Sequence, residues 1–280
     1  MVLQILTLVK FNELLFVINE IKMPEQKRIE QSLNLLLDIC SLMMSSGADT
    51  KRVINSVNRF AEALDFKAHE LISHKSIIMT LIDKRKNETY TVVTQIPKYH
   101  INFTMVSEIS KLSWIVVDKK WVYSDIFNEF DTIKKAKRYP LYLELLTVSA
   151  AGAGFASLFG GDYINIFITF FATLFGFSVS KIAAYYNINA YARTYLAATS
   201  ASLIASIGLL LQIVEEPQIS LATSVLFLIP GVPLVNSFID LFNNHILNGI
   251  VRFISGFLSV LAIGLGVITA MLIYNINNFM

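Results

Sequence analysis

One short segment of the sequence holds the residues best suited to chemistry. Pro230, Gly231 and Pro233 interrupt an apolar segment of membrane length, and Asn236 and Asp240 follow within one or two helical turns. Proline lacks a backbone donor and clashes with the preceding turn, so the prolines predict a kinked or broken helix. Intramembrane carboxylates and freed backbone groups are tolerated where they face protein or a watery cavity. The segment therefore predicts a broken helix that lines a polar site. The alternative is a kinked structural helix with Asp240 at the membrane surface.

Four further charged residues lie in or beside apolar segments. Glu144 follows Pro140 by one turn and could join Asp240 in binding a cation or proton, or could extend to the cytoplasmic interface. Lys181, Arg193 and Arg252 could contact an anionic group, or could serve only to set the orientation of the chain.

The sequence contains few of the residue patterns that enzymes and metal sites need. The histidines are scattered without metal-ligand spacing, and Cys40 is the single cysteine. The sequence shows neither a phosphate-binding glycine loop nor a nucleophile elbow. We therefore predict no catalytic residues, no metal, no cofactor and no enzymatic activity.

The distribution of charge divides the chain in two. Residues 1–138 hold 20 of the 23 Lys and Arg residues and 16 of the 21 Asp and Glu residues, although the mean hydropathy of the whole chain is +0.56. This contrast predicts a water-soluble part followed by a bilayer part. The net charge of +2 argues against a nucleic-acid partner, and a single cysteine fits a reducing compartment for the soluble part.

The sequence of the soluble part predicts a small α+β domain. We interpret residues 1–28 as an N-terminal extension or amphipathic helix, because the features of a signal peptide are missing. Residues 29–138 follow with two helices joined at Gly47, a β-hairpin with one further strand at residues 69–73, and two more amphipathic helices. Asp49 or Thr50, and Asn102 or Thr104, are the expected helix caps.

Residues 139–280 predict a helical transmembrane domain of five spans, one of them broken by proline. The spans are placed at residues 139–159, 163–180, 194–214, 219–239 and 253–274. Basic residues fall on alternate sides of these spans, which places the soluble domain in the cytoplasm and the C-terminus outside. Small residues in the spans predict close packing of several helices inside a bundle.

Several segments resemble the threonine/serine exporter family. PGVPLVNSFIDLFNNHILNGIVR resembles its membrane signature, LLLDICSLMMSSGADTKRVINSVNRFAEALDF its cytosolic domain, and VVTQIPKYHINFTMVSEISKL the segment after its β-hairpin. The resemblance covers about residues 29–274. This chain departs from the family at Thr94, Gln95, Lys98 and Tyr99, where arginines are expected. It also stops after one membrane half, like the larger member of the family's split, two-component form.

The resemblance implies a subunit of a secondary exporter in the cytoplasmic (inner) membrane. The partner would be a small membrane protein that supplies the second transmembrane half, or further copies of the chain. The expected substrate is threonine or serine. Amides around Gly231 would receive its carboxylate, Asp240 with Glu144 would bind its ammonium or a coupling proton, and Asn236 would orient it. The alternatives are a dicarboxylate of the succinate type, held by Lys181, Arg193 or Arg252, and a membrane-anchored regulatory module without transport.

Overall fold

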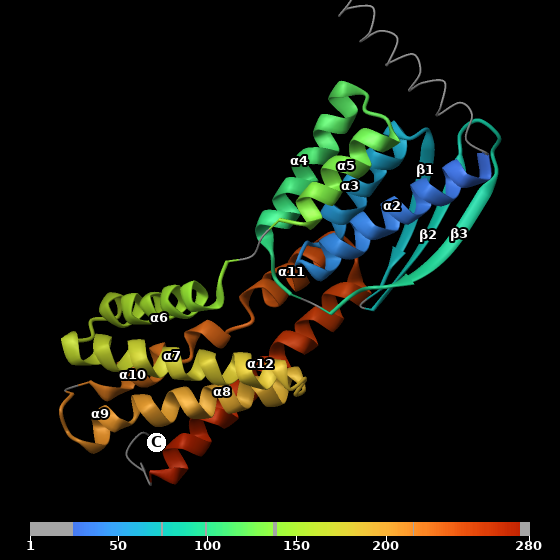
Figure 1. Cartoon of the computed structure of the whole chain (residues 1–280). Helices are drawn as coiled ribbons and strands as arrows, with labels where there is room; N and C mark the ends of the chain where they lie inside the picture. The colour runs from blue at the N-terminus through green and yellow to red at the C-terminus, as the bar shows by residue number, and fades with distance from the viewer. Residues whose placement is uncertain (1–24, 74, 99, 137–138, 215, 275–280) are drawn as a thin grey trace, which may run out of the picture. The chain divides into compact units, whose positions relative to one another are not determined.

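The computed structural model describes residues 25–73, 75–98, 100–136, 139–214 and 216–274 (Figure 1). The predicted N-terminal extension therefore lies almost wholly outside the described residues. The chain divides into two compact units, Met1–Ala136 and Lys137–Met280.

The N-terminal unit has the element order ααβββαα that the sequence predicts. It contains α2 (Glu25–Ser45), α3 (Thr50–Ala63), β1 (Phe66–Ile72), β2 (Ser76–Asp83), β3 (Thr89–Gln95), α4 (Phe103–Lys119) and α5 (Tyr123–Lys134). Local signals set the boundaries. Gly47 ends α2 in a left-handed conformation with φ 97°, Asp49 accepts a hydrogen bond from the Arg52 amide, and Asn102 accepts one from the Met105 amide.

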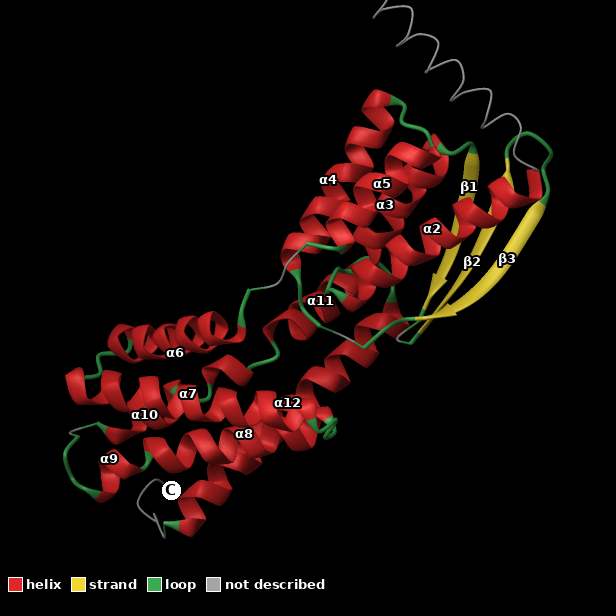
Figure 2. Cartoon of the chain, viewed as in Figure 1, coloured by secondary structure: helices red, strands yellow, loops and turns green. Residues whose placement is uncertain are grey.

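The three strands form an antiparallel sheet in the order β1-β2-β3 (Figure 2). In the register, Glu70 lies opposite Met79 and His69 lies opposite Thr80. Alternate residues of β1 and β2 are buried beneath α2 and α3, while the residues between them face away. The core of this unit lies between that face and the helices, and its largest fully buried side chains include Phe60, Phe66, Leu36, Ile39, Met43, Ile77 and Met79.

All regular elements among the described residues of the C-terminal unit are helices or 3₁₀ turns. The unit contains α6 (Leu141–Leu158), α7 (Tyr163–Tyr185), α8 (Ala190–Ala205), α9 (Ile207–Leu210), α10 (Pro217–Thr223), the 3₁₀ turn η1 (Leu226–Leu228), α11 (Gly231–Phe242) and α12 (Ile246–Ile273). α8 packs against both α7 and α12, and α11 packs against α12 as a hairpin.

Glycines allow the helices of this unit to approach closely, as predicted. A Cβ added at Gly176 of α7 would lie 2.7 Å from the Ala201 Cβ of α8, and one at Gly266 of α12 would lie 2.7 Å from the Ala198 Cβ. Real Cβ atoms do not approach this closely, so α7 and α12 each touch α8 at a position where only hydrogen fits.

The five predicted spans are not confirmed. Among the residues that the structure describes, three helices are long and apolar enough to cross a membrane, namely α6, α7 and α12. Pro217–Leu228 and Gly231–Phe242 pass the same test only as a pair bent by 60°, which gives a fourth crossing if the pair is one span. α8 has 16 residues, so at about 1.5 Å per residue it falls short of a hydrocarbon core of roughly 30 Å.

Candidate functional site

The bent helix pair interrupts the regular helical backbone of the C-terminal unit. η1 ends at Leu228, and α11 begins at Gly231 with Pro230 as its N-cap residue. Prolines in the first turn of α11 cost no helical hydrogen bond, because the first amides of a helix have no partner within it. The Gly231 N–H donates to the Ile229 carbonyl at 2.8 Å, and Pro233 has no N–H to offer. The start of α11 is therefore a poorer anion site in this conformation than the sequence suggests.

Polar side chains gather on the face of α11 that meets α12. Asn236, Ser237 and Asp240 are the buried residues of α11, and their spacing places them on one side of the helix. α12 contributes Asn248, which is buried, and Arg252, whose side chain is 11% exposed. These polar side chains of α11 and α12 are therefore buried within the unit rather than exposed on its surface.

An ion pair joins the two helices within this cluster. The Arg252 Nε lies 3.4 Å from the Asp240 Oδ2, and the Asp240 side chain is fully buried. Sequence reasoning placed Arg252 beyond the fourth span as a possible surface charge. The structure instead brings it together with Asp240 in the same helix hairpin, because α12 begins at Ile246 and carries Arg252 almost two turns inside the helix.

Tight backbone geometry positions this pair. Asn244 adopts a left-handed conformation with φ 63°, and the His245 N–H donates to the Asp240 carbonyl at 2.8 Å, so the chain reverses directly after α11. A Cβ added at Gly249 would lie 2.7 Å from the Leu241 Cγ and 2.9 Å from the Ser237 carbonyl oxygen. Only glycine allows this approach, which holds the two helices near enough for a direct contact between their charges.

Glu144 and Lys181 form a second ion pair, between α6 and α7. The Lys181 Nζ donates to the Glu144 Oε2 at 2.5 Å and lies 4.9 Å from the ring centroid of Phe177. The two side chains are 34% and 38% exposed, so this pair is far more accessible than the one on α11 and α12. Lys181, which the sequence offered as a possible anion contact, thus has a carboxylate partner within the unit.

Arg193 lies in the first turn of α8, after a connection built from two asparagines. Asn187 adopts φ 54° directly after α7, and the Asn189 Oδ1 accepts a hydrogen bond from the Tyr191 amide as the cap of α8. These roles account for both asparagines without a ligand.

Sequence reasoning missed a buried seam of polar side chains where α7 meets α10. Asn165, Thr169 and Thr173 recur every four residues and lie on one face of α7. The Thr169 and Thr223 hydroxyls are 3.2 Å apart, and the Thr173 hydroxyl donates to the Ser224 carbonyl at 3.4 Å. The four-residue spacing was the available signal. The seam attaches the first half of the bent pair to α7.

Comparison with known proteins gives a family for this arrangement. The model of a family described as "Putative threonine/serine exporter" (ThrE) matches residues 34–274, which include most of the N-terminal unit and the bent helix pair. The chain is similar to the "Probable succinate transporter subunit YjjP" of Klebsiella aerogenes, with 28% identity over 260 residues that cover 92% of this chain and 100% of the relative. It is also similar to the protein of the same description from Escherichia coli K12, with 29% identity over 245 residues, 86% of this chain and 94% of the relative. No solved structure matches the chain.

These relatives are described as transporter subunits and not as enzymes, and several apolar helices of this chain are long enough to cross a membrane. Because the family model matches most of the chain, the chain is a multi-pass membrane protein that belongs to the threonine/serine exporter family.

Proposed function

We propose that this chain is one subunit of a secondary exporter of small metabolites that carry a carboxylate group. The observation that carries this proposal is the buried ion pair between Asp240 on α11, the second half of the bent helix pair, and Arg252 on α12. Ionisable groups inside a membrane are costly and generally serve ion or substrate pathways. Helices interrupted in the membrane are the usual place for such sites in transporters.

Arg252 is the residue we assign to the substrate carboxylate. A guanidinium offers several donors in a planar fork that matches a carboxylate, and it stays charged at every physiological pH. The Gly231 amide already donates to the Ile229 carbonyl, which makes Arg252 the better anion receptor of the two. In this proposal the substrate carboxylate replaces Asp240 on Arg252. The displaced Asp240 carboxylate then takes a coupling proton or a cationic group of the substrate, and Asn236 orients the substrate by hydrogen bonding.

A dicarboxylate of the succinate type is the first candidate substrate. Two relatives that align over nearly their whole length are described as probable succinate transporter subunits. The buried position of Arg252 supplies a cationic group that the sequence alone placed at the surface. The second substrate carboxylate would then be bound by residues of another subunit.

Threonine or serine is the second candidate. The family description names these amino acids, and the buried pair offers both charges that a zwitterion needs. Arg252 would bind the carboxylate of the amino acid and Asp240 would bind its ammonium group.

The assembly we propose is the two-component form. The relatives are described as subunits, and this chain covers 100% and 94% of their lengths. A small membrane protein would supply the second transmembrane half, with further copies of this chain as the alternative. We place the assembly in the cytoplasmic (inner) membrane with the N-terminal unit in the cytoplasm and the C-terminus outside. Five crossings require that α8 spans as a short helix, which its position between α7 and α12 would permit because neighbouring protein shields much of it from lipid.

The decisive experiment is uptake of labelled succinate, threonine and serine into inverted membrane vesicles. The vesicles would contain this chain with its small partner, or either protein alone. We expect uptake of one substrate class only when both proteins are present. Uptake should fall at least about tenfold in Arg252→Gln, the loss expected when about 1.4 kcal/mol or more of binding is removed. Arg193→Gln is the matched comparison, because Arg193 is the other arginine among the described residues of the C-terminal unit.

A further pair of outcomes separates the substrates. If the substrate is a dicarboxylate, Asp240→Asn should retain exchange of labelled for unlabelled substrate and lose its dependence on pH. If the substrate is an amino acid, Asp240→Asn should lose exchange as well. Wild-type transport in Arg252→Gln, with the partner verified in the vesicles, would refute the assignment of the carboxylate to Arg252.

A further inference from the structure

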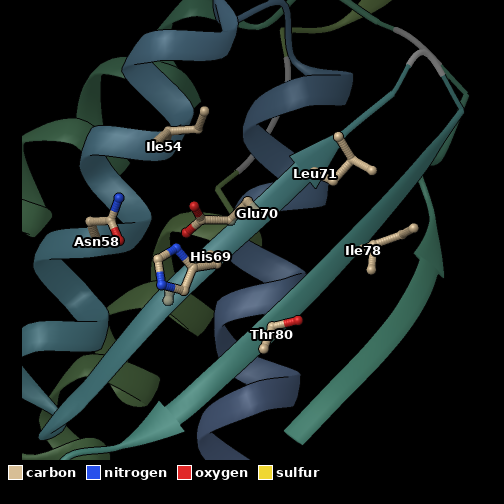
Figure 3. Close-up of a pocket in the computed structure, with 8 residues that line it drawn as sticks. Ile54, Asn58, His69, Glu70, Leu71, Ile78 and Thr80 are labelled. Atoms are coloured by element: carbon tan, nitrogen blue, oxygen red, sulfur yellow. The ribbon is translucent and has the colours of Figure 1, made fainter. Parts of the chain in front are cut away.

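A cavity in the N-terminal unit contains a partly buried acidic side chain that the transport proposal does not use. The cavity has a volume of about 420 Å³ and lies along β1 where this edge strand meets α3. Figure 3 shows the Glu70 carboxyl directed toward α3, with Asn58 and Ile54 on that helix beside it. The lining also includes Ala68, which is buried on the same face of β1 as Glu70. The remaining lining residues lie on the opposite face of the sheet, around the edge strand β1, and are His69, Leu71, Ile78 and Thr80.

Glu70 is exceptional among the acidic residues of this unit. Its Oε1 is shielded from solvent and has no hydrogen-bond partner among the described residues. Burial raises the pKa of this carboxyl to about 7, and the hydrogen bond from its own backbone opposes that shift only in part. A buried acceptor without a donor costs about 1–3 kcal/mol in a folded protein. Such a group in a cavity with a shifted pKa is a candidate binding site.

The surroundings of Glu70 leave it without a compensating positive charge. α3 contributes Ile54 and the neutral Asn58, and β2 contributes Met79, its partner across the sheet. From α2, the Cys40 thiol interacts electrostatically with Glu70, and burial raises the thiol pKa so far that it stays neutral. Of the described residues that line the cavity, only Glu70 and His69 are ionisable, and none is a lysine or an arginine.

We propose that this cavity binds a small organic ammonium ligand, whose cationic group donates hydrogen bonds to the Glu70 carboxylate and to the side-chain oxygen of Asn58. The volume suits a small metabolite and lies near the lower end of about 300–1,000 Å³ for ligand pockets. Ile54 supplies an apolar contact for a short aliphatic part beside Glu70. Leu71, Ile78 and the Thr80 hydroxyl line the part of the cavity on the other face of the sheet. A single carboxylate among neutral donors and acceptors does not make a site for a divalent metal, which needs several oxygen ligands.

The chemistry also excludes ligands of the opposite charge. A dicarboxylate or phosphate would meet the Glu70 carboxylate without a cation to offset the repulsion. The site therefore recognises a different group from the one assigned to Arg252, and it does not depend on which substrate is transported. Its place in a soluble unit attached to a transport unit suits a sensor of cytoplasmic metabolites.

The test uses the purified full chain and three probes that share one skeleton. The probes are 1-amino-2-propanol, 1,2-propanediol and lactate, which carry a positive, a zero and a negative charge at one end. Ligand-observed saturation-transfer NMR suits weak binding by small molecules. At pH 8 we expect saturable binding of 1-amino-2-propanol alone. Its affinity should fall about tenfold between pH 8 and pH 6, because protonation with a pKa of about 7 removes the carboxylate that binds it.

Two substitutions test whether the Glu70 carboxylate binds the ligand or only supports the fold. Glu70→Gln should abolish binding, whereas Glu129→Gln, which neutralises an exposed carboxylate on α5, should leave it unchanged. Because histidine titrates in the same pH range, His69→Gln tests the source of the pH dependence and should preserve it. Equal binding of 1,2-propanediol, no binding of the amine at pH 8, or an affinity independent of pH in the wild-type chain would each overturn the proposal. All three results are obtained with the wild-type chain and therefore hold even if Glu70→Gln misfolds.

Discussion

The stability of the α11–α12 hairpin should depend strongly on the pairing of Asp240 with Arg252. Both side chains are almost or completely buried, and their Nε and Oδ2 atoms are 3.4 Å apart. Removal of one member of a buried pair leaves the other charge without its counterion and costs about 3–5 kcal/mol. Asp240→Asn and Arg252→Gln should each therefore lower the free energy of unfolding by that amount. At about 1.4 kcal/mol per factor of ten, the unfolding equilibrium constant should rise by roughly two to four powers of ten.

The double variant supplies the internal check. Asp240→Asn combined with Arg252→Gln removes both charges and should recover most of the lost stability, since neutral replacement of a buried pair is often close to neutral overall. Unfolding of the purified chain by increasing SDS in mixed micelles, followed by circular dichroism, measures all of these values. Glu144→Gln provides the matched control. Its ion pair with Lys181 is about one-third exposed on each side, so the loss should be about 0–1 kcal/mol. An equal cost for Asp240→Asn and Glu144→Gln would refute the reasoning.

Three further predictions concern other parts of the chain. Gly266→Val places a side chain against α8 and should cost about 1–3 kcal/mol in SDS unfolding, while Gly264→Val, which has open space around its Cβ, should cost less than 1 kcal/mol. Folding raises the pKa of Glu70 from about 4.5 to about 7, so the folded state binds more protons between these values and the N-terminal unit loses stability as pH rises through them. Urea unfolding should show this loss in the wild type, and Glu70→Gln should remove it. Asn102→Ala should lower the free energy of unfolding by about 1 kcal/mol through loss of the α4 cap, again measured in urea.

Local patterns were sufficient to predict the N-terminal unit. The signals for its helices lie within a few residues of the helix ends that they determine. They are the helical spacing of apolar residues, Gly47 after the first helix, and the caps Asp49 and Asn102. The alternation of buried residues along β1 and β2 is similarly local. Sequence reasoning identified the strand that carries Glu70 but not its environment. That environment depends on α3, whose Ile54 and Asn58 reach the cavity only once the unit has folded.

The membrane part was harder to predict, because hydropathy records composition and not the continuity of a helix. Residues 194–214 are apolar enough for a span, yet α8 ends at Ala205. The pairing of Asp240 with Arg252 was missed for a related reason. The segment between them was interpreted as a connection outside the membrane, whereas α11 extends to Phe242 and α12 begins at Ile246. Only the turn at Asn244, which needs a left-handed residue, could have indicated so short a connection.

The junction at Ile229 and Pro230 has a mechanical consequence. On one side, Thr223 and Ser224 hold the end of α10 to α7 through contacts of their hydroxyl and carbonyl groups. On the other side, α11 is joined to α12 by a short turn, a close glycine contact and a buried ion pair. Both flanks therefore behave as stiff bodies, and the two residues between them lie outside regular helix. Any displacement of the α11–α12 hairpin relative to α7 must therefore rotate the backbone of this two-residue hinge and also shift α12 against α8.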